Sequence, residues 1–117
     1  MLRDATYRAY DPEKTLTHWH YVRTGEMRHI IPNHINADII INSAMPFELS
    51  IYKPKLIDSF QTWSEKYKND VLREDAFQRA SRVLQFLKAI ISIEDDTFVP
   101  GDSVIREFIG GSTLEYH

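Results

Sequence analysis

The sequence contains no cysteine. This absence excludes disulfide bonds, thiolate zinc sites and a cysteine nucleophile, and it fits the reducing cytoplasm, where we expect the protein to reside. No apolar run approaches the roughly 20 residues that a membrane-spanning helix needs, so we expect no membrane partner. The first residues, MLRDATYR, are polar and charged, unlike the apolar stretch of a signal peptide.

Three glycine-containing motifs are also missing. There is no G-x-x-x-x-G-K-S/T phosphate loop, no G-x-G-x-x-G dinucleotide-binding turn and no G-x-S-x-G nucleophile elbow. Gly110 and Gly111 come late in the chain, with no helix pattern after them. The sequence therefore shows no complete centre for nucleotide hydrolysis or acyl transfer.

The composition is that of an ordinary globular domain. The 117 residues are 43% hydrophobic and 26% charged, which suits one domain. The formal net charge of −3 gives no overall attraction to nucleic acid, so we expect no nucleic-acid partner. Residues 1–30 nevertheless hold five of the lysines and arginines against four acidic residues. The amino-terminal third is the part best suited to meet an anion.

The β signal is concentrated in residues 37–52, ADIIINSAMPFELSIY. A run of three isoleucines is typical of a strand buried on both faces. After a Ser-Ala-Met-Pro break, apolar side chains alternate with others at Phe47, Leu49 and Ile51, which is typical of a strand buried on one face. We therefore predict strands at about 38–42 and 47–52, whose open edge must be paired, covered or shared with another chain.

Helical patterns lie on both sides of this stretch. Asp11 as N-cap and Pro12 in the first position begin a helix that Pro32 ends. Pro54, also in a first position, begins the next helix. Asp70 caps the strongest helix, whose apolar residues recur every three or four positions to residue 91. This stripe is interpreted as core packing, with a homo-oligomer through the 71–91 helix or the exposed strand as the alternative.

The remaining helix features are local. Asp75 and Arg79 are spaced for an i, i+4 ion pair on the helix that Asp70 caps. Residues 103–111, SVIREFIGG, predict a short helix ended by glycines. As an organisation we predict a single domain or fragment, with a lid-like helical segment at 1–30, a strand region at 31–52 and carboxy-terminal helices at 53–117.

The histidines do not predict a metal site. His18 and His20 are two residues apart, which points them about 160° apart on a helix, so they share no metal-binding face. His29 and His34 lie on either side of Pro32 and would converge only through folding. We expect no metal site and keep a histidine-based metal enzyme as the weakest alternative.

The arginines are the stronger candidates for binding. Arg3 and Arg8 precede the first capped helix, and Arg23 and Arg28 lie further along it. Planar guanidinium groups match phosphate oxygens, so these residues could bind a phosphate. The alternative is a basic face that is merely solvated.

Taken in order, the motifs resemble the carboxy-terminal part of bacterial uridine kinase-like nucleoside kinases, in the phosphoribulokinase/uridine kinase group of P-loop proteins. Leu2-Arg3-Asp4 with Arg8 is similar to the family's LRD…ERG lid segment, although Tyr10 follows where many members have glycine. The helix with Trp19 and Val22-Arg23 resembles the one after the lid. Ile31-Pro32 and residues 37–41, ADIII, resemble LP…YADVII, and residues 103–112, SVIREFIGGS, resemble the ending SILREFIGGS.

The resemblance implies an α/β, helix-rich fold: lid helices, one or two strands and the carboxy-terminal helices of a P-loop kinase-like fold. It implies ATP-dependent phosphoryl transfer to the hydroxyl of uridine or another nucleoside, with ATP and Mg²⁺ as cofactors of the parent enzyme and none bound tightly by this chain. It places Arg3, Arg8 and Arg23 on the phosphates of the donor nucleotide, while the catalytic residues would lie upstream. The chain is then expected to be a fragment, inactive alone. The alternative is a stand-alone binding or oligomerisation domain without catalysis.

Overall fold

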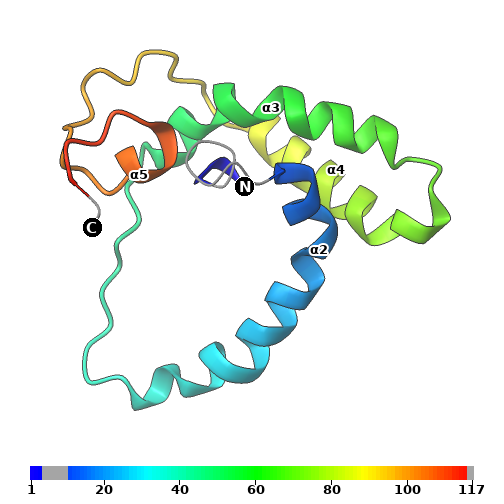
Figure 1. The fold of residues 1–117 in the computed structure, drawn as a ribbon, viewed down its shortest axis with the longest axis horizontal. Helices are drawn as coiled ribbons and strands as arrows, with labels where there is room; N and C mark the ends of the chain where they lie inside the picture. Colours follow the sequence, from blue (N-terminus) through cyan, green and yellow to red (C-terminus); the bar gives the residue numbers. More distant parts are fainter. Residues whose placement is uncertain (4–10, 116–117) are drawn as a thin grey trace.

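The computed structural model describes residues 1–3 and 11–115. The α-helices assigned there are α2 (Pro12–Gly25), α3 (Glu48–Lys66), α4 (Glu74–Ala89) and α5 (Arg106–Ile109). Shorter elements are the π-helical turn η1 (Glu26–Ile30) and the 3₁₀ turns η2 (Ile31–Asn36) and η3 (Val71–Arg73). The helices α3 and α4 run antiparallel, and α2 packs against α4 (Figure 1).

Two of the predicted helix starts, those at Asp11 and Asp70, are confirmed by their caps. The Asp11 carboxylate accepts a hydrogen bond from the Glu13 backbone N–H at 2.9 Å, with Pro12 as the first helical residue. The Asp70 carboxylate accepts from the Leu72 N–H at 3.0 Å and begins η3, which leads directly into α4. Each cap satisfies a backbone donor that has no partner within its own helix.

The prediction of two strands is wrong for the part of the chain described, which contains no β-strand. Residues 38–42 are extended but pair with nothing, and Ile39, Ile40 and Ile41 are 78%, 77% and 82% exposed. A strand needs a neighbouring strand to satisfy its backbone groups. Among the described residues no second extended segment lies alongside to provide one.

The second predicted strand, residues 47–52, is the start of α3. Phe47 is the N-cap residue of the helix and Ile51 follows four positions later, so both fall on one helical face. That face packs on Val99 and Ile105, whereas Leu49, which the alternation placed on the same side, is exposed. The helical spacing of Phe47 and Ile51 therefore prevails over the two-residue alternation.

Pro54 lies inside α3 instead of at its first position. Because proline has no N–H, the Ser50 carbonyl loses its usual helical partner. Ile93, in the loop after α4, donates its N–H to that carbonyl at 3.0 Å. A tertiary hydrogen bond thus replaces the missing helical one. Pro32 likewise does not end the first helical stretch, since η2 continues through it to Asn36.

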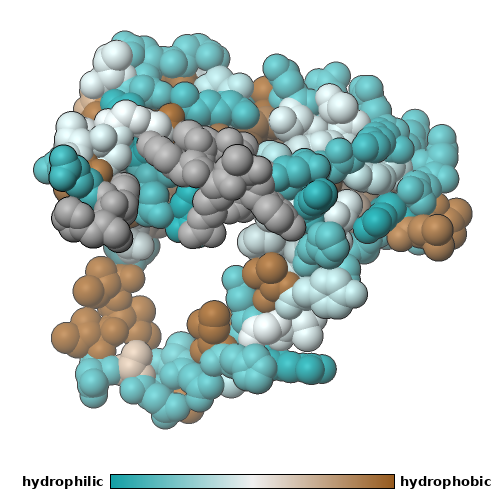
Figure 2. Space-filling view, in the orientation of Figure 1, coloured by the Kyte–Doolittle hydropathy of each residue, from teal (hydrophilic) through white to brown (hydrophobic). Residues whose placement is uncertain are grey.

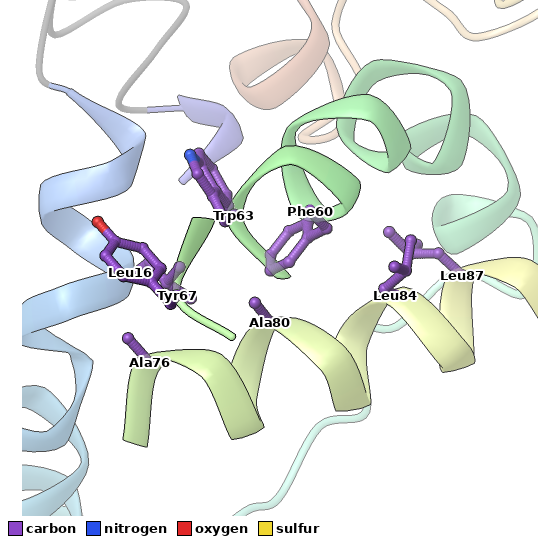
Figure 3. Close-up of a cluster of buried hydrophobic side chains, with 8 residues drawn as sticks. All are labelled: Leu16, Phe60, Trp63, Tyr67, Ala76, Ala80, Leu84 and Leu87. Atoms are coloured by element: carbon purple, nitrogen blue, oxygen red, sulfur yellow. The ribbon is translucent and has the colours of Figure 1, made fainter. Parts of the chain in front are cut away.

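The main core lies among α2, α3 and α4. Figure 3 shows its eight buried side chains, with the aromatic residues of α3 and its end facing the small and aliphatic residues of α4. Phe60 and Trp63 meet edge to face at 5.0 Å between ring centroids, and Leu16 is the residue of α2 in this cluster. The middle of the predicted α4 stripe is therefore core, which confirms that interpretation, while Leu72 and Ile91 at its ends are exposed.

A polar contact joins α2 to the end of α3. The Glu13 carboxylate accepts from Lys66 Nζ at 2.6 Å and from the Tyr67 hydroxyl. The Lys66 and Tyr67 hydrogen bonds lower the pKa of Glu13. Burial, together with the bond to Glu13, raises the pKa of Tyr67 to about 12. The link stabilises the docking of α2 most when Glu13 is ionised.

A smaller core under the carboxy-terminal loops is built from Ile51, Val99 and Ile105. Arg106 fastens these loops by donating to the Val99 and Asp96 carbonyls, both at 2.7 Å. Gly110 and Gly111 end α5 with φ values of 97° and 74°, a conformation that residues with a Cβ atom rarely adopt. The predicted short helix ended by glycines is confirmed.

The end of α2, the turns η1 and η2 and the extended segment together form an arm that projects from the two cores (Figure 1). The radius of gyration is 16.1 Å, whereas a compact domain of this length has a value of roughly 13 Å. The arm is the reason that the molecule is larger than its length predicts.

Candidate functional site

A hollow of ≈ 540 Å³ lies between α2 and α4 and gathers basic side chains. Three of its lining residues are arginines, one from α2 and two from α4. The full lining is Trp19, His20, Arg23, Thr24, Glu26, Arg79 and Arg82. With Asp75 at its margin, the site holds three guanidinium groups against two carboxylates, so it is positive even with His20 neutral.

Arg79 fixes the geometry of this arginine hollow. Its side chain is 14% exposed and donates from Nη1 to the Leu16 carbonyl of α2 at 2.6 Å. Its other terminal nitrogen contacts Asp75 Oδ2 at 3.2 Å, one helical turn earlier on α4, which confirms the predicted i, i+4 pair. Arg79 is therefore a clamp between the two helices as well as a source of positive charge.

The other two arginines are more available. Arg23 is 57% exposed and contacts Glu26 at 3.3 Å, a long, exposed ion pair of the kind that contributes little to stability. Arg82 is exposed, and within the described residues no hydrogen bond or ion pair engages its guanidinium. Because Arg79 and Arg82 are three residues apart, they lie on the same face of α4. An anion in the hollow would meet two guanidinium groups that have donors to spare.

A histidine completes the rim. His20 Nδ1 lies 3.6 Å from Asp75 Oδ2, and its ring lies against that of Tyr21, with 4.0 Å between centroids. The His20 side chain lies beside the arginines in the lining of the hollow. The site is thus suited to an oxyanion with several negative charges, such as a polyphosphate.

The structure separates the arginines that the sequence grouped together. Arg23 lies in the hollow, whereas Arg3 contacts Glu107 of α5 at 2.9 Å and lies over the Phe108 ring at 5.7 Å. Arg8 lies outside the described residues. Arg28 is exposed on η1 and does not line the hollow.

The sequence reasoning missed the α4 side of the site. The sequence pattern assigns Arg79 to its ion pair with Asp75 and does not single out Arg82. The three-residue spacing of Arg79 and Arg82 was a usable signal, since it puts two cations on one helical face. Which helix would lie opposite that face was not readable from the sequence.

A second hollow, of ≈ 360 Å³, lies at the turn between α3 and α4. Its polar residues are Lys68, Asn69, Asp70 and Glu74, of mixed charge, beside the rings of Tyr67 and Phe77. Asp70 is already engaged as the cap of η3. This surface therefore offers no concentrated charge to a ligand.

Other kinds of site find no support in the structure. Over residues 1–3 and 11–115, no group of three or more histidine or acidic side chains could hold a metal ion. No helix in the same ranges is both long and apolar enough to cross a bilayer. Comparisons of the chain with protein-family models, with curated proteins and with solved structures found no match.

Proposed function

We propose that the arginine hollow binds the phosphate groups of a nucleotide, and that the chain is a helical portion of an ATP-dependent nucleoside kinase. The observation that supports this proposal is the meeting of Arg23, which the motif resemblance assigns to donor phosphates, with Arg79 and Arg82. The Leu16–Arg79 hydrogen bond joins α2 to α4, and guanidinium groups from both helices line the hollow between them. Such a group of cations from two helices suits the charged oxygens of a phosphoryl group.

The chain alone would bind phosphate without transferring it. Phosphoryl transfer also needs groups that hold Mg²⁺ and a residue that orients the nucleophile, and the motif resemblance assigns neither role to a residue of this chain. We therefore propose ATP and Mg²⁺ as cofactors of the parent enzyme, a nucleoside as its acceptor and the cytoplasm as its location. The roles of Arg3 and Arg8 stay predictions.

The test is calorimetric titration of the purified chain with ATP and with tripolyphosphate, both without Mg²⁺. Arg23→Gln and Arg82→Gln should each weaken binding about tenfold, because each removes a charge-assisted contact of roughly 1.5 kcal/mol. The matched control is Lys88→Gln, which removes the same charge from α4 at an exposed position outside the hollow. It should leave the affinity nearly unchanged.

Two results would count against the proposal. Equal affinities for all three variants would show a diffuse electrostatic attraction, without a site. Rapid phosphate transfer from ATP to uridine by this chain would show that it contains a whole active centre. The comparison of the affinities for ATP and tripolyphosphate tests whether the adenine base contributes to binding. If it does, ATP should bind more tightly.

A further inference from the structure

The extended segment of residues 37–43 is unexplained by phosphate binding. Its three consecutive isoleucines are each more than three-quarters exposed. Figure 2 shows an apolar cluster on this segment, clear of the rest of the molecule. Scattered apolar residues are normal on a surface, but a contiguous group of large side chains marks an interaction surface.

The backbone of this segment is as open as its side chains. Ala37 has φ −80° and ψ 132°, in the β region, and the chain stays non-helical up to α3. Within the described ranges, no hydrogen bond reaches the backbone of residues 38–41. The backbone groups of residues 38–41 are thus free on both sides, and an unpaired non-helical segment of this kind is a template for a strand.

We propose that two copies of this chain associate through residues 37–43, paired as antiparallel strands about a two-fold axis at Ile40. In that register Ile39 of each copy faces Ile41 of the other, and Asp38 faces Asn42. The Asn42 Oδ1 already accepts the Ala44 N–H at 3.1 Å in its own chain, which leaves its Nδ2 to donate to the Asp38 carboxylate. Parallel, in-register pairing would instead place the two Asp38 side chains together, which is unfavourable.

The same register gives the two-stranded ribbon an apolar and a more polar face. Side chains alternate along a strand, so the outer isoleucines of both copies share one face, and Ile40 lies on the other between the polar pairs. A two-stranded ribbon is marginal without packing on one face. The helical turns just before the segment expose further apolar side chains, so the apolar surface of the arm extends beyond the ribbon: Ile30, Ile31 and Ile35.

This inference does not depend on phosphate binding, because the segment contributes no residue to the arginine hollow. The occupant is a second copy because the segment complements itself: apolar side chains face apolar ones, and a carboxylate faces an amide. A two-fold pairing of one patch with itself is also the commonest symmetry of protein dimers.

Disulfide cross-linking tests the register in a chain that has no cysteine of its own. Residues opposite each other on antiparallel strands are about 4.5–5.5 Å apart between Cα atoms, which suits a disulfide. Under oxidised glutathione, Ile40→Cys should therefore form a covalent dimer rapidly. Asp38→Cys should not, because the two copies of residue 38 would be about 14 Å apart. Ile91→Cys, exposed outside the segment, reports random collision.

Sedimentation equilibrium tests the association itself. The wild-type chain should change from monomer to dimer as its concentration rises over about two orders of magnitude. Ile40→Lys should remain monomeric, because two lysines would face each other at the axis, and it should keep the helical circular dichroism of the wild type. Ile91→Lys should still dimerise. A wild-type monomer at every concentration, or a dimer that Ile40→Lys preserves, would overturn the proposal, as would equal cross-linking of the three cysteine variants.

Discussion

Leu16 is the side chain through which α2 enters the main core, and its truncation tests how the arginine hollow is held together. The residue is 0% exposed and lies among Tyr67, Ala76 and Ala80 (Figure 3). Leu-to-Ala changes at fully buried sites cost about 2–5 kcal/mol, less where neighbours can close the cavity. The alanines of α4 are too short to fill the space, so we expect the free energy of unfolding to fall by about 3–4 kcal/mol for Leu16→Ala.

The expected thermal consequence is large. For a chain of this size, each kcal/mol lowers the melting temperature by about 3–6 °C, so the variant should melt about 10–20 °C below the wild type. The assay is urea unfolding followed by circular dichroism, supported by thermal melting. The control is Val22→Ala on the same helix, which is 46% exposed and should change stability by less than about 0.5 kcal/mol.

The same variant links stability to binding. Leu16 also supplies the carbonyl that accepts the Arg79 hydrogen bond, and that carbonyl belongs to the backbone, so it is retained in Leu16→Ala. Looser packing of α2 should nevertheless separate Arg23 from Arg82 for part of the time and weaken tripolyphosphate binding. If Leu16→Ala lowered the free energy of unfolding by less than about 1 kcal/mol, or by no more than Val22→Ala does, the claim that Leu16 anchors α2 would be refuted.

Two further changes have defined signs. Glu13 has a lowered pKa because of its bonds to Lys66 and Tyr67, so its contribution is present above its unfolded value of 4.5 and is lost as the pH falls through the folded value. Urea unfolding from about pH 6 down to pH 3 should therefore show a shallower decline for Glu13→Gln than for the wild type, and an equally steep decline would contradict the Glu13 link. Gly25 is helical with nothing within 4 Å of an added Cβ, whereas Gly111 has a φ of +74°. Gly25→Ala should raise the free energy of unfolding by about 0.5–1 kcal/mol and so raise the melting temperature, whereas Gly111→Ala should lower the melting temperature. A shift of the same sign in both variants would contradict this reasoning.

Local chemistry explains why the helix starts at Asp11 and Asp70 were predictable, whereas the one expected at Pro54 was wrong. Asp11 and Asp70 cap backbone donors within two residues of themselves, so their effect needs nothing from the rest of the chain. The Asp75–Arg79 pair and the glycines after α5 are equally local. The three- and four-residue spacing in α4 is also a local pattern, and its central residues became the core as predicted.

The strand predictions were wrong because a strand is a tertiary arrangement. Three isoleucines favour an extended backbone, and residues 38–42 are extended, but pairing needs a neighbour that the described residues do not supply. Phe47 and Ile51 fit both an alternating strand and one face of a helix. Their packing against Val99 and Ile105 decided for the helix.

The candidate site likewise combines local features of single helices with an arrangement that depends on tertiary packing. The cap at Asp11 and the three-residue spacing of Arg79 and Arg82 are local signals, so residue order is enough to place Arg23 on one helix and the other two arginines on one face of another. The meeting of these two faces depends on tertiary packing, because burial of Leu16 and the hydrogen bond from Arg79 to its carbonyl set how α2 lies on α4. Contacts between residues 63 positions apart depend on how the whole core packs, and no short pattern in the sequence encodes them.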